Sequence, residues 1–189
     1  ESAKGSAPKM FRVKSETGHP RYRQASSVIT PDVGLFELEE NDAPHTVQLA
    51  SHDELKQLGT GDALYVIGFP GRTMDEASPV ATFMASHVGR ITDAGGQKAS
   101  FAEGWLIQHE GQTTPGTSGS PIFNSAGKVV AINAGGLLEA NKQAVYKYAM
   151  RIDLLESIKV SGSSSKKTRP SPKDDDDDGS KGGDDDDDE

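Results

Sequence analysis

The sequence contains no cysteine, so disulfide bonds, thiolate nucleophiles and cysteine-based zinc sites are all excluded. It also contains no run of apolar residues that approaches the length needed to span a membrane. Hydrophobic residues make up only 33% of the 189 residues, which is low for a well-filled core. We therefore expect the apolar residues to be concentrated in one part of the chain, which is long enough for one domain or for two small lobes.

Residues 161–189 explain much of this shortage. They consist almost entirely of Ser, Lys, Pro, Gly and Asp, and because such a segment cannot bury enough apolar area to order itself, we expect a disordered acidic tail. The tail has eleven acidic and five basic residues, a net charge of −6, which leaves −3 of the chain's −9 for residues 1–160. A folded part so close to neutral does not suit a general nucleic-acid binder.

The tail contains two aspartate runs, Asp174–Asp178 and Asp184–Asp188. They could bind calcium weakly, imitate an acidic ligand for a basic partner, or only keep the chain soluble. An unbroken aspartate run lacks the turn-defined ligand spacing of a calcium loop, so the third interpretation is the simplest.

Short β-like segments with turns between them make up the rest of the chain. Alternating or β-rich segments are separated by Gly and Pro and cover 10–15, 22–29, 34–39, 63–71, 80–92, 105–111, 120–124, 128–135 and 144–152. Ser51 and Glu54 stand at the two positions of a capping box, which predicts one or two helical turns over 51–58. Residues 153–160 predict a short C-terminal helix. Because no helical pattern recurs between the strands, the sequence indicates an all-β barrel or sandwich.

The stretch GTSGSP, at 116–121, places a serine between two glycines. A serine hydroxyl becomes a useful nucleophile only with an adjacent base and with donors aimed at the oxyanion that forms after its attack. Glycines permit a bend in which successive amides point toward one place. We therefore expect Ser118 to be a nucleophile and the N–H groups of Gly116 and Ser118 to hold the oxyanion. The alternative is an ordinary Gly/Ser turn in a β protein.

This stretch resembles the G-x-S-G-[GS]-P signature of trypsin-like serine proteases. The longer segment WLIQHEGQTTPGTSGSPIFNSAGKVVAINAGG is similar to the region around the nucleophile in HtrA-type proteases and glutamyl endopeptidases. Three flanking segments also resemble those families, in the right order: GTGDALYVIGFPG, SHVGRIT and YAMRIDLLESI. The resemblance covers residues 10–160 and implies a chymotrypsin-like double β-barrel whose N-terminal barrel is incomplete.

The resemblance also implies a division of the chain. We expect residues 1–50 to be the remnant of the N-terminal barrel, 51–62 the link between the barrels, 63–160 the C-terminal barrel with the nucleophile loop, and 161–189 the tail. HtrA-type proteins usually continue into a PDZ domain, and the tail stands in its place here. PDZ-driven regulation is therefore not expected.

The residues PDVGLFEL, at 31–38, resemble the family's aspartate stretch, which implies that Asp32 accepts the Nδ1–H of a catalytic histidine. The alternative is that Asp32 only caps a turn. The family's T-x-x-H stretch has no match, and the two strands that follow it resemble 10–15 and 22–29, so the catalytic histidine is expected before residue 1. The chain's own histidines are His19, His45, His52, His87 and His109. We expect these to be surface or packing residues, and His19 as a relocated base is the remaining alternative.

The resemblance places the primary specificity pocket between the segment before the serine and the strand after it. Its expected lining residues are Gln112, Asn133, Ala134, Gly135 and Gly136. The glycines would leave the mouth open and offer backbone groups to an extended peptide. Glutamyl endopeptidases carry a histidine where this chain has Ile132 and Asn133, so the resemblance does not by itself imply acidic selectivity. The small Ala134 favours a small-to-medium apolar residue.

The sequence therefore predicts a serine endopeptidase that uses a Ser-His-Asp triad and needs no metal or organic cofactor. The N-terminus has no initiating Met and no signal peptide, which fits an internal or processed start, so the chain as written is expected to be inactive or nearly so. The alternative is a catalytically dead peptide-binding module of the same fold. The expected partner is an extended peptide or protein, with no nucleic acid and no membrane span. The resemblance favours a secreted or periplasmic location and leaves a cytoplasmic one and the oligomeric state open.

Overall fold

Most of the protein that the computed structural model describes is β-strand. The described residues are 10–24, 28–40, 45–71, 79–138 and 144–160, with the side chains of 137–146 outside the description. The strands are β1 (Val13–Gly18), β2 (Gly34–Leu38), β3 (Ala63–Gly68), β4 (Thr82–Thr92), β5 (Leu106–His109), β6 (Pro121–Phe123), β7 (Val129–Leu138) and β8 (Ala144–Arg151). Within this part of the chain the helices are α1 (His52–Gln57) and the short 3-10 helix η1 (Ile152–Ser157). The predicted acidic tail lies outside the described residues.

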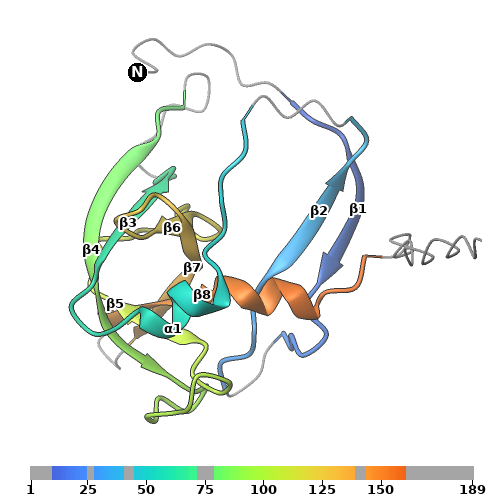
Figure 1. Cartoon of the computed structure of the whole chain (residues 1–189). Helices are drawn as coiled ribbons and strands as arrows, with labels where there is room; N and C mark the ends of the chain where they lie inside the picture. Colours follow the sequence, from blue (N-terminus) through green and yellow to red (C-terminus); the bar gives the residue numbers. More distant parts are fainter. Residues whose placement is uncertain (1–9, 25–27, 41–44, 72–78, 139–143, 161–189) are drawn as a thin grey trace, which may run out of the picture.

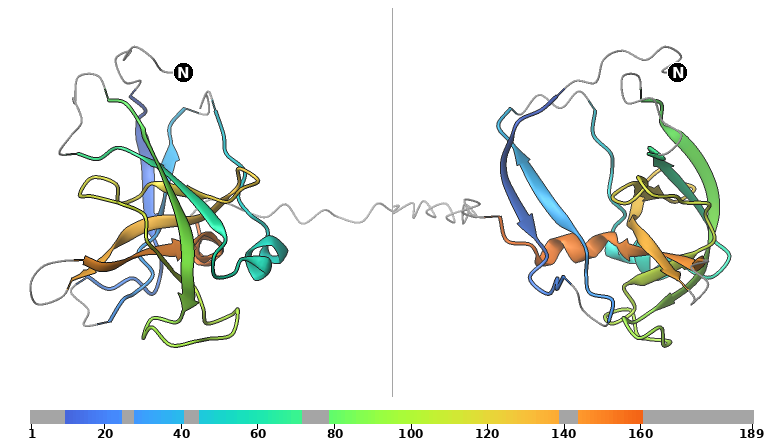
Figure 2. Two further views of the ribbon diagram at one scale, coloured as in Figure 1. Left: turned by 90° about the vertical axis from the view of Figure 1, so that its left-hand side faces the viewer. Right: turned by 180° about the vertical axis from the view of Figure 1, so that it is seen from behind.

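Strands β3 to β8 close into a barrel in the order β3-β4-β5-β8-β7-β6, with antiparallel neighbours. Strands β1 and β2 form a separate two-stranded sheet. Figure 1 shows this sheet to the right of the barrel with η1 running between them, and the view from behind in Figure 2 agrees. The all-β class, the closed C-terminal barrel and the incomplete first barrel are thus confirmed, whereas the finer domain boundaries stay a prediction.

One expected strand is wrong. The described residues of 22–29 form no strand, because β1 pairs directly with β2, from Val13 opposite Leu38 to Gly18 opposite Gly34. The backbone N–H of His19 continues this ladder by donating to the Val33 carbonyl at 2.9 Å.

Two apolar clusters hold the molecule together. The first fills the barrel with buried side chains such as Leu64, Ile107 and Ile122, each of them fully buried. The second joins Val33, just before β2, to the barrel residues Trp105, Leu106 and Met150 and to Leu154 of η1. Since burial of such side chains contributes about 1.5–3 kcal/mol each, the second cluster fixes the segment around Val33 against the barrel. It thereby fixes the place of Asp32, the residue before Val33.

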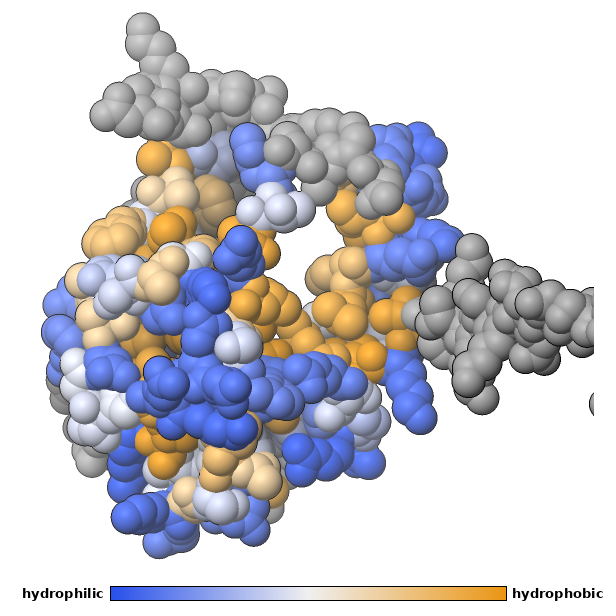
Figure 3. All heavy atoms as spheres, in the orientation of Figure 1, coloured by the Kyte–Doolittle hydropathy of each residue, from blue (hydrophilic) through white to orange (hydrophobic). Residues whose placement is uncertain are grey.

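The β1–β2 sheet keeps an apolar face that the described residues do not cover. Figure 3 shows a hollow between this sheet and the barrel, with apolar side chains gathered around it. Phe36 of β2 is 69% exposed, although it lies in the middle of a paired strand. This face matters for the site, because Phe36 lines the same cavity as Asp32 and Ser118.

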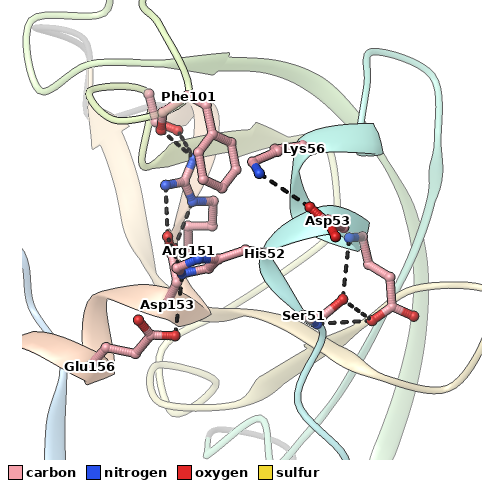
Figure 4. A network of polar contacts seen from close by, with 10 residues as sticks. Ser51, His52, Asp53, Lys56, Phe101, Arg151, Asp153 and Glu156 are labelled. Carbon is pink, nitrogen blue, oxygen red and sulfur yellow. Dashed lines mark hydrogen bonds and ion pairs between the residues drawn. The ribbon is translucent and has the colours of Figure 1, made fainter.

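A buried arginine at the end of β8 ties η1 to the barrel (Figure 4). The Arg151 guanidinium donates to both carboxylate oxygens of Asp153, at 2.7 and 2.8 Å, and to the carbonyl oxygens of Phe101 and Gly104, at 2.8 and 2.7 Å. It also lies 3.9 Å from the centroid of the Phe101 ring, within cation–π range. These contacts use the planar donor fork of arginine, which lysine does not have.

The capping box predicted at the start of α1 is confirmed. The Glu54 N–H donates to the Ser51 hydroxyl at 3.4 Å, and the Ser51 N–H donates to the Glu54 carboxylate at 2.8 Å. The same carboxylate accepts from Lys128, beside β7, at 2.6 Å. The Lys128 hydrogen bond, followed by those from Ser51, lowers the pKa of Glu54 to about 2.

Candidate active site

The loop of residues 110–120, called the nucleophile loop after its predicted role, is a tight turn between β5 and β6. Gly116 and Gly119 have φ of +101° and +83°, a region that favours glycine. The Thr117 N–H donates to the Thr114 carbonyl at 3.0 Å, and the Gly119 N–H donates to the Asn133 carbonyl of β7 at 2.8 Å. The loop therefore bends at its glycines, as the sequence predicts, and presents Ser118 exposed at its tip.

The corner that follows β3 packs closely against this loop. A Cβ atom on Gly116 would overlap the backbone nitrogen of Gly71 and lie 2.9 Å from the Phe69 carbonyl oxygen. The Gly71 N–H donates to the Pro115 carbonyl at 3.1 Å. The Phe-Pro-Gly corner thus holds the loop in place from outside.

Two amide donors beside Ser118 are unused. Across the described ranges, the N–H groups of Gly116 and Ser118 have no hydrogen-bond acceptor, although their neighbours Thr117 and Gly119 both donate. The Ser118 hydroxyl donates to the Ala134 carbonyl oxygen at 3.1 Å. Exposed, unpaired amides flanking a hydroxyl are the donors that an oxyanion requires.

The structure brings Asp32 and Ser118 to the same cavity. It has a volume of about 510 Å³ and lies between β2, the nucleophile loop, β7 and η1. Its lining residues are Asp32, Val33, Gly34, Phe36, Ser118, Gly119, Ile132, Asn133, Ala134 and Leu155. Burial and then the charge of Asp32 raise the pKa of Tyr148, a residue of β8.

The five histidines of the chain, all of them among the described residues, do not line this cavity. His19 is 3% exposed, and its Nδ1 accepts from the Arg21 N–H at 3.1 Å. The hydrogen bond from the His19 N–H to the Val33 carbonyl places His19 near Asp32, but His19 does not line the cavity. Nothing in this geometry supports His19 as a relocated base.

A second pocket, of about 380 Å³, opens on the other side of Ser118. Its lining residues are Thr113, Thr114, Pro115, Thr117, Ser118, Asn133, Gly135, Gly136 and Lys147. Of the residues expected in the primary pocket, Asn133, Gly135 and Gly136 lie here. Ala134 lines the 510 Å³ cavity instead, and Gln112 is exposed and lines neither.

Comparison with known proteins decides the family. The sequence profile described as "Trypsin-like peptidase domain" matches residues 4–132. The chain belongs to the trypsin-like peptidase domain family. It is 30% identical over 141 residues to a "Probable periplasmic serine endoprotease DegP-like" of Pseudomonas fulva, covering 71% of this chain and 26% of that protein.

A second relative is the "Glutamyl endopeptidase" of Staphylococcus aureus, 36% identical over 81 residues, which is 43% of this chain and 20% of that protein. The chain thus spans about a quarter or less of the length of these curated relatives. Among solved structures, "HtrA-type protease AlgW with decapeptide" aligns with a TM-score of 0.48 and 19% identity, over 65% of this chain and 34% of that one. In the described part of the chain, no helix is long and apolar enough to cross a membrane.

In this peptidase domain a buried asparagine ties the nucleophile loop to the barrel wall. Asn133 is 2% exposed, and its amide nitrogen donates to the Thr117 carbonyl at 2.9 Å. Its amide oxygen lies 3.2 Å from Nε2 of His109. Because Nδ1 of His109 accepts from the Gly111 N–H at 3.2 Å, the proton of the neutral ring is on Nε2 and faces Asn133.

Burial lowers the pKa of His109, which favours this neutral form. Sequence reasoning treated His109 as a packing residue and missed its bond to Asn133. It also missed Lys147 in the pocket wall. The only early signal for Lys147 was its place in an alternating strand, which does not say which face is turned inward.

Proposed function

We propose that this peptidase domain is part of a serine endopeptidase in which Ser118 is the nucleophile and Asp32 orients a histidine supplied from outside residues 1–189. One observation carries the proposal: Asp32 and Ser118 line one cavity, with room between them. The hydroxyl is exposed, and the free amides of Gly116 and Ser118 stand beside it. A triad needs this combination of nucleophile, acid and oxyanion donors.

The reaction is acyl transfer. The Ser118 hydroxyl attacks the scissile carbonyl while the histidine takes its proton, and the oxyanion accepts from the two amides. The histidine then protonates the leaving amine, and water hydrolyses the acyl-enzyme by the same steps in reverse order. Asp32 holds the imidazole in the correct tautomer and stabilises it when protonated. Among the described residues the hydroxyl has only the Ala134 carbonyl as an acceptor, and a carbonyl is far too weak a base to take the proton.

The substrate class is an extended peptide or protein. Gly135 and Gly136 of β7 line the pocket beside Ser118 and bring backbone rather than side chains to its wall. An extended peptide can add to such a strand through main-chain hydrogen bonds. The name of the Pseudomonas relative, a serine endoprotease, supports the same class.

Labelling of the full-length gene product with a fluorophosphonate probe tests the proposal. We expect covalent labelling that Ser118→Ala abolishes and that the control Ser125→Ala, at an exposed turn position, leaves unchanged. A folded full-length protein that the probe does not label would contradict the proposal. In that case retained binding of an unlabelled peptide would favour the non-catalytic binding module.

A further inference from the structure

Lys147 occupies the wall of the pocket beside Ser118. It pairs with His109 of β5 on one side and with Gly136 of β7 on the other. Directly paired residues of antiparallel strands point to the same face of a sheet. His109 is buried against Asn133, which lines the pocket, so Lys147 is on the face turned toward the pocket.

The Lys147 ammonium has no counter-charge in the part of the chain that the structure describes. Among the described residues it makes no ion pair and no hydrogen bond, although Lys14, Lys56 and Lys128 each contact a carboxylate at 2.6–3.1 Å. Lys147 is also half-buried, so it is only partly hydrated. A partly desolvated cation without a partner is costly, and an anion bound beside it offsets that cost.

A neutral donor stands in the same pocket. Thr113 is 8% exposed, and across the described residues its hydroxyl has no hydrogen-bond partner. The Asn133 amide, in contrast, is occupied by His109 and Thr117. Of the described residues that line the pocket, none is acidic. The polar side chains of the pocket that remain available to a ligand are therefore one cation, Lys147, and neutral hydroxyls, of which that of Thr113 is buried, and this set suits a carboxylate.

We propose that Lys147 determines specificity by binding the acidic side chain, glutamate or aspartate, of the substrate residue whose carbonyl Ser118 attacks, with the Thr113 hydroxyl as a second donor. The inference rests on the proposed function. It replaces the apolar preference that the sequence alone favours. The cation comes from β8, whereas Ile132 and Asn133, where the resemblance places the histidine of glutamyl endopeptidases, belong to β7.

Hydrolysis of four matched fluorogenic peptides by the full-length gene product tests this inference. The peptides differ only in the residue before the cleaved bond, which is Glu, Gln, Leu or Lys. We expect kcat/KM to be about 10-fold to 100-fold higher for Glu than for Gln, the range of a charge-assisted hydrogen bond. Lys147→Met should bring that ratio close to one, and Lys147→Glu should favour Lys. The control Lys98→Met, at an exposed position outside the pocket, should change nothing.

The outcomes separate the two proposals. If the protein is labelled by the fluorophosphonate probe but cleaves Glu and Gln peptides equally, or if Lys147→Met leaves the ratio unchanged, the inference is overturned and the proposed function stands. If there is no hydrolysis at all, we measure binding of the same peptides to the Ser118→Ala variant by fluorescence polarisation. The relative affinities then decide whether the inference holds. Tighter binding of the Glu peptide that Lys147→Met removes supports the inference, and equal binding of all four overturns it.

Discussion

The hydroxyl of Ser118 donates to the carbonyl oxygen of Ala134 at 3.1 Å. This bond aims the side chain toward β7, at the boundary between the 510 Å³ cavity that Asp32 borders and the pocket that Lys147 lines. A serine protease needs its nucleophile between an acid–base partner and a specificity pocket. The position of the Ser118 hydroxyl is therefore important both for the proposed chemistry and for the proposed selectivity.

Gly116 should not tolerate a side chain. In Gly116→Ala the new Cβ would overlap the Gly71 nitrogen and would also force φ = +101° on a non-glycine residue. We expect a loss of about 3 kcal/mol of unfolding free energy, from backbone strain and overpacking together, and slower fluorophosphonate labelling. Gly119 provides the matched control, since its φ is +83° but its Cβ would meet nothing within 4 Å.

Urea unfolding of the two variants separates these effects. Gly119→Ala should lose only the strain contribution, about 1–2 kcal/mol. Equal losses in the two variants would show that the corner after β3 does not hold the loop.

Asn133→Ala should weaken both stability and catalysis. It leaves the buried Nε2–H of His109 without an acceptor and removes the donor to the Thr117 carbonyl. We expect a loss of about 2–4 kcal/mol of unfolding free energy, from the unpaired group and the cavity. Labelling at Ser118 should slow as well, because Thr117 directly precedes it. Gln112→Ala, at an exposed position of the nucleophile loop, is the control and should change the unfolding free energy by less than about 0.5 kcal/mol. Comparable effects of the two substitutions would refute the structural role of Asn133.

Stability should fall on mild acidification. Burial, followed by the charge of Lys147, lowers the pKa of His109, and burial with Arg21 lowers that of His19. The unfolded chain therefore binds protons first, starting near pH 6.5, and unfolding free energy is lost as the pH falls from there through the lower folded pKa values. Urea unfolding at a series of pH values should show this slope, and His109→Gln should make it shallower. A wild-type stability that stays flat or rises between pH 7 and 5 would contradict the burial of neutral histidines.

Much of this architecture could be predicted from residues alone. The glycines around Ser118 require a bend whatever the rest of the fold, and the capping box at Ser51 depends on a spacing of three residues. Both features are local. The pairing partner of a strand is not a local property. The sequence therefore predicts a strand over 22–29, although β1 pairs with β2 instead. Strand propensity describes a pleated surface and does not name the neighbour.

The place of Lys147 in the pocket wall could not be predicted from the sequence either, because it also depends on how the strands pair. The register of β7 against β8 shifts between Asn133 and Gly135, and such a bulge changes which face later residues share. The face on which Lys147 lies follows from its pairing with His109 in β5, whereas the alternation of β8 alone does not say which of its two faces is turned inward. The packing of Gly116 on Gly71 likewise joins segments 45 positions apart, and only the closed barrel brings them together.

The central claim is that Asp32 and Ser118 belong to one catalytic site, and the rate of fluorophosphonate labelling of Asp32→Asn in the full-length gene product tests it most directly. We predict labelling about 10³-fold to 10⁴-fold slower than in the wild type, because an asparagine orients the histidine in the wrong tautomer. Folding should be intact, and the exposed control Asp53→Asn should label at the wild-type rate. Labelling of Asp32→Asn as fast as the wild type would contradict the account.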